Sequence, residues 1–186
     1  IWIGTEDGLN KYDGYGFTIY KPQLNDQHSI SNSRILSIAQ DYSGNLWIGT
    51  NGGGLNKYIR KSDKFQNIVA VDDTLAGSVI FSILPFGVNG LWIGTDKGLA
   101  LVDIETGTYS HIENEFPELQ SLAGIPINAL ISDDSVLWIG TSKGLFRFNT
   151  IEKSLQHYVI PSEKQPLQNE AVTALLTDRH QNLIIG

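Results

Sequence analysis

The sequence predicts an all-β protein built from repeated four-stranded sheets. A string of the form Leu/Ile-Trp-Ile-Gly-Thr occurs four times, with its tryptophan at Trp2, Trp47, Trp92 and Trp138. A weaker copy, Leu183-Ile184-Ile185-Gly186, has Ile184 in the tryptophan position, and the successive spacings are 45, 45, 46 and 46 residues. No segment combines helical periodicity with capping residues, so we expect no long helix.

One repeat shows how the strands follow one another. Residues 34–40 alternate loosely and predict a first strand, and the apolar run 46–50 predicts a second strand buried on both faces. Residues 55–58 and 65–69 predict the third and fourth strands. Between them lie turn-forming residues, including Asp41 to Asn45 and a glycine run at 52–54.

The turn between the second and third strands has the form Thr-x-x-Gly in three repeats. It runs from Thr5 to Gly8, from Thr95 to Gly98 and from Thr141 to Gly144, and the second repeat has a longer, glycine-rich version. Two polar residues followed by glycine predict a three-residue hairpin: a type I turn and a left-handed third residue. The glycine that follows Trp-Ile in every repeat is expected to admit a neighbouring sheet.

Repeated sheets of about 45 residues with one tryptophan each indicate a β-propeller. A β-sandwich is the alternative, but it does not call for identical strands at fixed spacing. We expect a single propeller segment over residues 1–186, with blades starting near the four tryptophans and a partial fifth at Ile184. The tryptophans are expected to be buried structural residues at equivalent places, not sugar-stacking platforms.

Composition narrows the functional classes. The chain has 186 residues, 13 Lys and Arg against 20 Asp and Glu, and a net charge of −7. This balance argues against nucleic-acid binding and against an anionic membrane surface. No apolar stretch is long enough for membrane insertion, and the lack of cysteine excludes disulfides and thiolate metal sites.

Residues that could support catalysis or metal binding do not form a known motif. His111 and His157 share a repeat position, but they are predicted on the outer strand of separate blades, without metal-binding spacing. Asp72-Asp73 and Asp133-Asp134 are adjacent pairs in loops and turns, not catalytic dyads. We therefore expect no cofactor, no metal and no catalytic residue.

The repeat resembles a known family. The segment Asp41-Tyr42-Ser43-Gly44-Asn45-Leu46-Trp47-Ile48-Gly49-Thr50 is similar to the two-component regulator propeller repeat, and the likeness extends over nearly the whole chain. Two positions depart from it: residues 86–90 replace the usual Asp-x-x-Gly turn, and Ile184 replaces tryptophan. The resemblance implies the periplasmic sensor region of a hybrid two-component histidine kinase that responds to oligosaccharides from glycan breakdown.

The same resemblance implies a larger assembly. Such sensors typically carry two propellers of about seven blades, followed by a membrane helix, kinase and receiver domains. We therefore expect a fragment of a larger propeller, with further blades of the same protein and a homodimer as partners. A closed four-bladed propeller is the alternative.

In a propeller, the Thr-x-x-Gly turns and the segments before each first strand share one rim, where ligands commonly dock. The candidate ligand-binding residues there are Asn32, Arg34, Asn128, Asn169, Glu170, Asp96 and Lys97. Glu6, Asp7, Asn51, Ser142 and Lys143 lie on the same predicted rim. Two other functions stay open: a propeller enzyme, such as a lyase or a quinone-dependent dehydrogenase, and a purely structural interaction module.

Overall fold

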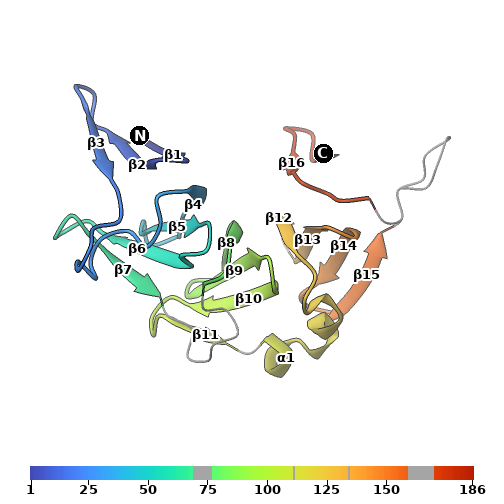
Figure 1. Ribbon diagram of the computed structural model, residues 1–186. Helices are drawn as coiled ribbons and strands as arrows, with labels where there is room; N and C mark the ends of the chain where they lie inside the picture. Colours follow the sequence, from blue (N-terminus) through green and yellow to red (C-terminus); the bar gives the residue numbers. More distant parts are fainter. Residues whose placement is uncertain (69–76, 111, 134, 159–169) are drawn as a thin grey trace. The chain divides into compact units, whose positions relative to one another are not determined.

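The protein is all-β, and its sheets follow one another along the chain (Figure 1). The computed structural model describes residues 1–68, 77–110, 112–133, 135–158 and 170–186. Within each sheet, strands that are neighbours in sequence are also hydrogen-bonded neighbours. This is the blade arrangement that the repeat predicts, and three of the sheets have four strands.

The strand bounds agree with the repeat boundaries. The first sheet contains β1 (Trp2–Thr5), β2 (Gly8–Tyr12) and β3 (Phe17–Tyr20). The second contains β4 (Ile35–Gln40), β5 (Leu46–Thr50), β6 (Leu55–Ile59) and β7 (Lys64–Ile68). The third contains β8 (Ile80–Phe86), β9 (Gly90–Thr95), β10 (Gly98–Asp103) and β11 (Thr108–Ser110). The fourth contains β12 (Ile127–Asp133), β13 (Val136–Thr141), β14 (Gly144–Asn149) and β15 (Ser154–Tyr158), and the last contains β16 (Leu175–Thr177) and β17 (Leu183–Ile185).

Residues 1–93 and 101–110 form one compact unit. One cluster of its core lies between the first two sheets and contains Leu9, Ile30, Ile35, Ile48, Tyr58 and Phe65. Trp2, Tyr20, Ile38 and Leu46 pack against this core. The cross-strand register accounts for the packing, because Gly4, Leu9 and Tyr20 are paired partners and therefore lie on the same face of the first sheet.

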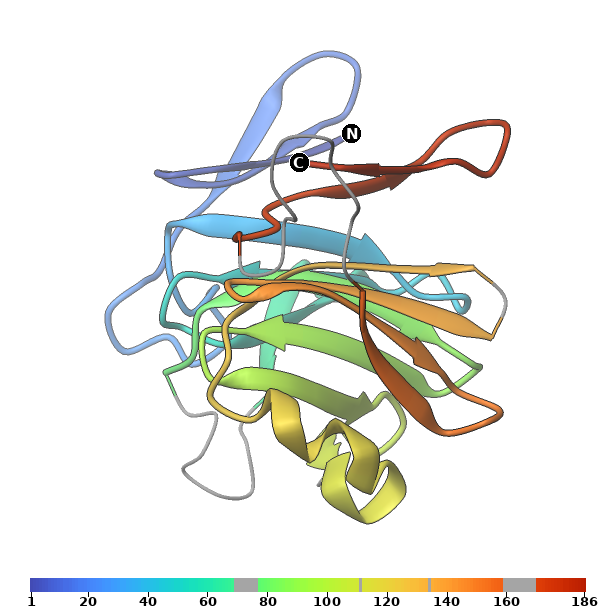
Figure 2. The same ribbon diagram turned by 90° about the vertical axis from the view of Figure 1, so that its right-hand side faces the viewer.

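Residues 94–100 and 111–186 form the second unit. The sheet β12–β15 contributes the buried side chains of Ile127, Leu137, Ile139, Leu145 and Phe148. Two short helical turns, α1 (Ile112–Glu115) and η1 (Pro117–Leu122), precede this sheet and are drawn in yellow in Figure 2. Phe116 between them meets Phe148 edge to face, with ring centroids 5.4 Å apart.

The glycine after Trp-Ile is the contact point between successive sheets, as predicted. A Cβ on Gly4 would lie 2.7 Å from Cγ2 of Ile35, and one on Gly49 would lie 2.6 Å from Cγ2 of Ile80. In the second unit, a Cβ on Gly140 would lie 2.7 Å from Cγ1 of Val172. Each glycine therefore makes room for a branched residue at the start of the next sheet or, for Val172, just before it.

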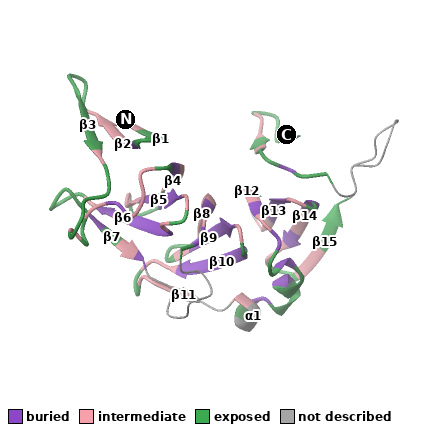
Figure 3. Ribbon diagram, viewed as in Figure 1, coloured by how far each residue is buried: buried purple, intermediate pink, exposed green. Residues whose placement is uncertain are grey.

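The four tryptophans are not equally buried, which corrects the expectation of four equivalent core positions. Trp47 is 0% exposed and Trp92 is 1% exposed. Trp2 and Trp138 are half-buried. Strand β1 is itself mostly exposed, whereas β5 and β9 are buried along most of their length (Figure 3). The tryptophan position is therefore fully covered only where strands and neighbouring sheets enclose it.

Candidate ligand-binding rim and cationic groove

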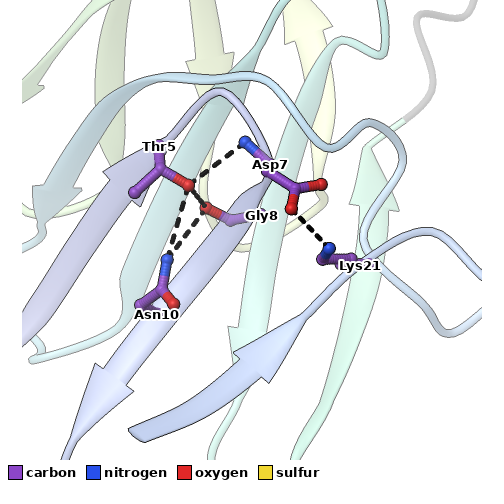
Figure 4. Close-up of polar contacts among 5 residues, drawn as sticks. All are labelled: Thr5, Asp7, Gly8, Asn10 and Lys21. Atoms are coloured by element: carbon purple, nitrogen blue, oxygen red, sulfur yellow. Dashed lines mark hydrogen bonds and ion pairs between the residues drawn. The ribbon is translucent and has the colours of Figure 1, made fainter.

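The Thr-x-x-Gly turn is held by its threonine. Oγ1 of Thr5 donates a hydrogen bond to the carbonyl of Gly8 (2.8 Å) and accepts one from the backbone N–H of Asp7 (3.2 Å), as Figure 4 shows. Asn10 supports the same turn through its side-chain amide. The glycine has φ +132°, in the region that disfavours other residues, as the sequence predicts. Gly8 pairs with Thr5, so only two residues lie outside the pairing, one fewer than the predicted three-residue loop.

The other two copies of this turn have the same bonds. Oγ1 of Thr95 donates to the carbonyl of Gly98, and Oγ1 of Thr141 donates to that of Gly144, both at 2.8 Å. Two residues lie between the threonine and the glycine of each turn. They are Glu6-Asp7, Asp96-Lys97 and Ser142-Lys143, the residues that the sequence assigns to the rim.

In the first unit, the rim residues form one connected group. A guanidinium nitrogen of Arg34 lies 3.3 Å from Oε1 of Glu6, and both side chains are more than half exposed. Oδ1 of Asn32 accepts a hydrogen bond from the backbone N–H of Arg34 (2.9 Å). The carbonyl of Arg34 accepts one from the N–H of Asn51 (3.0 Å). The predicted residues Asn32 and Arg34 are thus brought together, with Glu6 as the counter-charge.

In the second unit, the rim residues have separate surroundings. The side-chain amide of Asn128 donates to the carbonyl of Val172 (2.9 Å) from a position where the β12–β13 register shifts by one residue. The carbonyl of Lys97 accepts a hydrogen bond from the N–H of Gly124 (2.8 Å), and Lys97 itself is exposed. Glu170 is exposed, and Asn169 lies outside the described residues. The side-chain amide of Asn128 is therefore turned to the backbone of Val172, in contrast to the Arg34–Glu6 pair of the first unit.

The turn between the first and second strands is organised by a buried carboxylate. Oδ1 of Asp41 accepts hydrogen bonds from the backbone N–H groups of Ser43 and Asn45, and Oδ2 accepts from the side chains of Asn45 and Trp47. Burial opposes ionisation, but the hydrogen bonds from Trp47 and Asn45 outweigh it and hold the pKa of Asp41 below its ordinary value. Asp178 forms the same backbone bonds in the last repeat, where Ile184 has no side-chain N–H to donate.

A groove of about 760 Å³ opens beside this turn, between the first and second sheets of the first unit. It is lined by Trp2, Lys11, Gln40, Ser43, Gly44, Asn45, Leu46, Lys57, Tyr58, Ile59, Arg60 and Lys61. None of these residues is on the predicted rim. The sequence offers only a weak signal for the groove, the basic residues at 57, 60 and 61, because its walls come from different repeats.

The segment that contains the Asp41 turn is similar to a known protein family. The sequence model of the family described as "Two component regulator propeller" matches residues 29–52, which include the Asp41 turn, Trp47 and Gly49. A histidine kinase, "Histidine kinase P4" of Formosa agariphila, is 39% identical over 160 residues.

The chain carries two-component regulator propeller repeats.

Solved structures place these propeller repeats in the same fold. The extracellular domain of the putative hybrid two component system BT3049 from B. thetaiotaomicron superposes with a TM-score of 0.79 at 27% identity. That of the putative one component system BT4673 from the same organism superposes with a TM-score of 0.80 at 24% identity. Both matches cover 100% of this chain, but 25% and 24% of those chains. The match to the Formosa kinase likewise covers 81% of this chain but only 11% of that protein.

The propeller repeats leave few groups for other chemistry in the described part of the chain. Among the described residues, no three His, Cys, Asp or Glu side chains are grouped so that they could hold a metal ion. His157 lies on the edge strand β15 and stacks on Phe146 at 4.5 Å, whereas His111 lies outside the described residues. Asp72, Asp73 and Asp134 also lie outside them. No helix among the described residues has the length and apolar character needed to span a membrane.

Proposed function

We propose that this chain is a ligand-sensing propeller segment from the extracytoplasmic part of a two-component sensor. The observation that carries the proposal is the set of propeller repeats shared with a histidine kinase at 39% identity over 160 residues. Two similar structures are extracellular domains of a putative hybrid two component system and a putative one component system, and this supports an extracytoplasmic and, by extension, periplasmic position.

We infer that the segment recognises and does not catalyse. The Thr-x-x-Gly turns present exposed or half-buried polar side chains on hairpins held by their threonines, which suits hydrogen bonding to sugar hydroxyls. Glycan-derived oligosaccharides are the proposed ligand class. Kinase activity belongs to parts of the protein beyond these repeats.

Signal transfer requires that the ligand bind two arrangements of the sensor unequally, because equal affinity shifts no equilibrium. Each sheet is joined to the next by a glycine contact with no spare room, so a single blade is a stiff unit. The proposed carrier of the signal is therefore a change in packing between whole propellers or protomers.

Calorimetric titration of the full-length protein with oligosaccharide pools tests the sensor function. Binding of a pool component supports it, and turnover of any glycan by this segment would contradict the non-catalytic role. Arg34→Ala and Glu170→Ala test the rim, with Lys64→Ala, an exposed cation in β7, as the control. Unchanged affinity in both rim variants would remove the rim assignment and leave the sensor function standing.

A sensor function for the whole protein also needs contacts beyond this chain. On the first sheet, Ile3 and Ile19 lie on the face opposite Leu9 and are 43% and 57% exposed. We propose that this face packs against a further blade of the same protein or, in a homodimer, against a second copy. Its apolar character favours a protein partner over a sugar.

A further inference from the structure

We propose that the groove between the first two sheets binds the anionic group of an acidic oligosaccharide, one that carries carboxylate or sulfate. The inference rests on the sensor function proposed above and names the ligand's chemistry. It also places binding at a site distinct from the predicted rim.

The lining of the groove is cationic in an acidic chain. Lys11, Lys57, Arg60 and Lys61 contribute four of the chain's 13 Lys and Arg residues, and none of the lining residues carries a carboxylate. The chain as a whole has a net charge of −7. Four like charges around one concave site repel one another, and an anionic ligand relieves that repulsion.

Three of the four cations have no internal counter-charge. Within the described ranges, the three ion pairs of the chain are Lys11–Asp63, Lys21–Asp7 and Arg34–Glu6. Lys57, Arg60 and Lys61 are in none of them. The ammonium group of Lys57 lies 5.1 Å from the centre of the Trp47 ring, a contact that positions the cation without neutralising it.

The fourth cation is held in place by neighbouring strands. Nζ of Lys11 donates to the hydroxyl of Tyr58 (3.1 Å) and lies 3.7 Å from Oδ1 of Asp63. Tyr58 and Tyr20 both donate hydrogen bonds to that same carboxylate oxygen. The charge of Asp63, which is exposed, is therefore shared among three donors. The nearby buried carboxylate of Asp41 is satisfied by hydrogen bonds from its own turn and from Trp47.

The remaining lining suits a sugar better than a small inorganic anion. Trp2 is half-buried and packs edge-on against Tyr58 with centroids 4.8 Å apart, which leaves part of an apolar ring facing the groove. Gln40, Ser43 and Asn45 add polar groups. A volume of about 760 Å³ is typical of sites for ligands of several rings, which lie at roughly 300–1,000 Å³.

Titration of the full-length protein with three probes tests this inference: trigalacturonate, a sulfated chondroitin tetrasaccharide, and neutral maltotriose. We expect at least one acidic probe to bind about tenfold or more tightly than maltotriose, with affinity falling several-fold between about 50 and 300 mM NaCl. Comparison of the two acidic probes distinguishes a carboxylate ligand from a sulfate ligand. Sodium sulfate serves as a fourth probe, and binding as tight as that of the oligosaccharides would overturn the sugar assignment.

The charge variants are Lys57→Gln, Arg60→Gln and Lys61→Gln. Each is expected to weaken binding of the acidic probe about 3- to 10-fold. Arg179→Gln removes an exposed arginine in the second unit and is expected to leave affinity within about twofold. Arg60 and Lys61 are exposed, so their substitution should not disturb folding, and the thermal midpoint checks this.

The outcomes separate the two proposals. The groove proposal fails if maltotriose and the acidic probes bind with equal affinity, or if the charge variants bind the acidic probe as tightly as Arg179→Gln does. Either result leaves the proposed sensor function standing. If no probe and no component of an oligosaccharide pool binds the full-length protein, the proposed sensor function itself fails.

Discussion

Asp41 shows how much one side chain decides in this protein. It is 5% exposed, and its two oxygens accept four hydrogen bonds, which tie the turn at 41–45 to the indole of Trp47. The tryptophan of the repeat is therefore both a core residue and a hydrogen-bond donor. Where Ile184 replaces it, the Asp178 turn keeps only the bonds from His180 and Asn182.

Asp41→Asn should lower the free energy of unfolding by about 1–3 kcal/mol, because the new amide cannot accept from all four donors in this buried place. The depressed pKa of Asp41 sets the sign of the pH effect. Its stabilisation is present above the unfolded-state pKa of about 4 and is lost as pH falls through the folded-state value. Denaturant melts of both proteins should therefore converge at low pH, and a constant difference down to about pH 2 would contradict the role of the carboxylate.

Trp92→Ala should cost about 3–5 kcal/mol, because the side chain is 1% exposed and its removal leaves a large cavity. Trp2→Ala is the matched comparison at the same repeat position. Trp2 is half-buried, so its loss should cost less than half as much. Urea melts measure both, and equal losses would show that exposure does not set the energetic role of this position.

At the scale of the element, the blade is defined by its contact with the next blade. The glycine in β5 lies against Ile80 of β8, and the glycine in β1 lies against Ile35 of β4. Strand and turn propensities make each sheet, but this contact sets the spacing between sheets.

Gly49→Ala should destabilise the protein by about 1–3 kcal/mol, because the added methyl would collide with Oγ of Ser37 and would lie 2.6 Å from Cγ2 of Ile80. Gly16→Ala is the control, since a methyl there meets nothing within 4 Å, and it should change stability by less than about 0.5 kcal/mol. The double variant Gly49→Ala, Ile80→Ala, which removes Cγ2 of Ile80, should lose less stability than the sum of the two single variants. Additive losses in the double variant would argue against a steric origin.

At the scale of the whole molecule, the first sheet exposes an apolar face that the equivalent strands of the next three sheets bury. Ile3 is 43% exposed, whereas the residues at the same repeat position, Ile48, Ile93 and Ile139, are 0% exposed. Phe17 and Ile19 are 59% and 57% exposed on the same sheet. The same sequence motif is thus exposed in the first sheet and buried in the next three, depending on whether neighbouring strands and sheets cover it.

The 186-residue chain is therefore expected to self-associate, since exposed apolar faces of this kind drive association. Ile3→Ser with Ile19→Ser should shift light scattering towards monomer. Arg179→Ser is the control for a surface change elsewhere. A monodisperse monomer before any substitution would instead favour the closed four-bladed alternative.

Local sequence determined the strands, their order within each sheet and the glycine-dependent turns. These depend on alternation and turn chemistry over a few residues, so the Trp47 strand could be predicted over 46–50, as observed. The close approach at Gly49 could also be predicted, because a glycine inside a strand weakens it and often marks a place where a neighbouring chain comes close.

Tertiary structure alone decided which polar groups meet. Lys11 and Tyr58 are 47 residues apart, yet they are hydrogen-bonded and both line the groove. Tyr20 and Asp63, 43 residues apart, are hydrogen-bonded as well. Arg34 likewise finds Glu6 across two sheets, and the register shift at Asn128 directs its amide to Val172. Such contacts depend on how neighbouring sheets pack, and no local pattern carries that information.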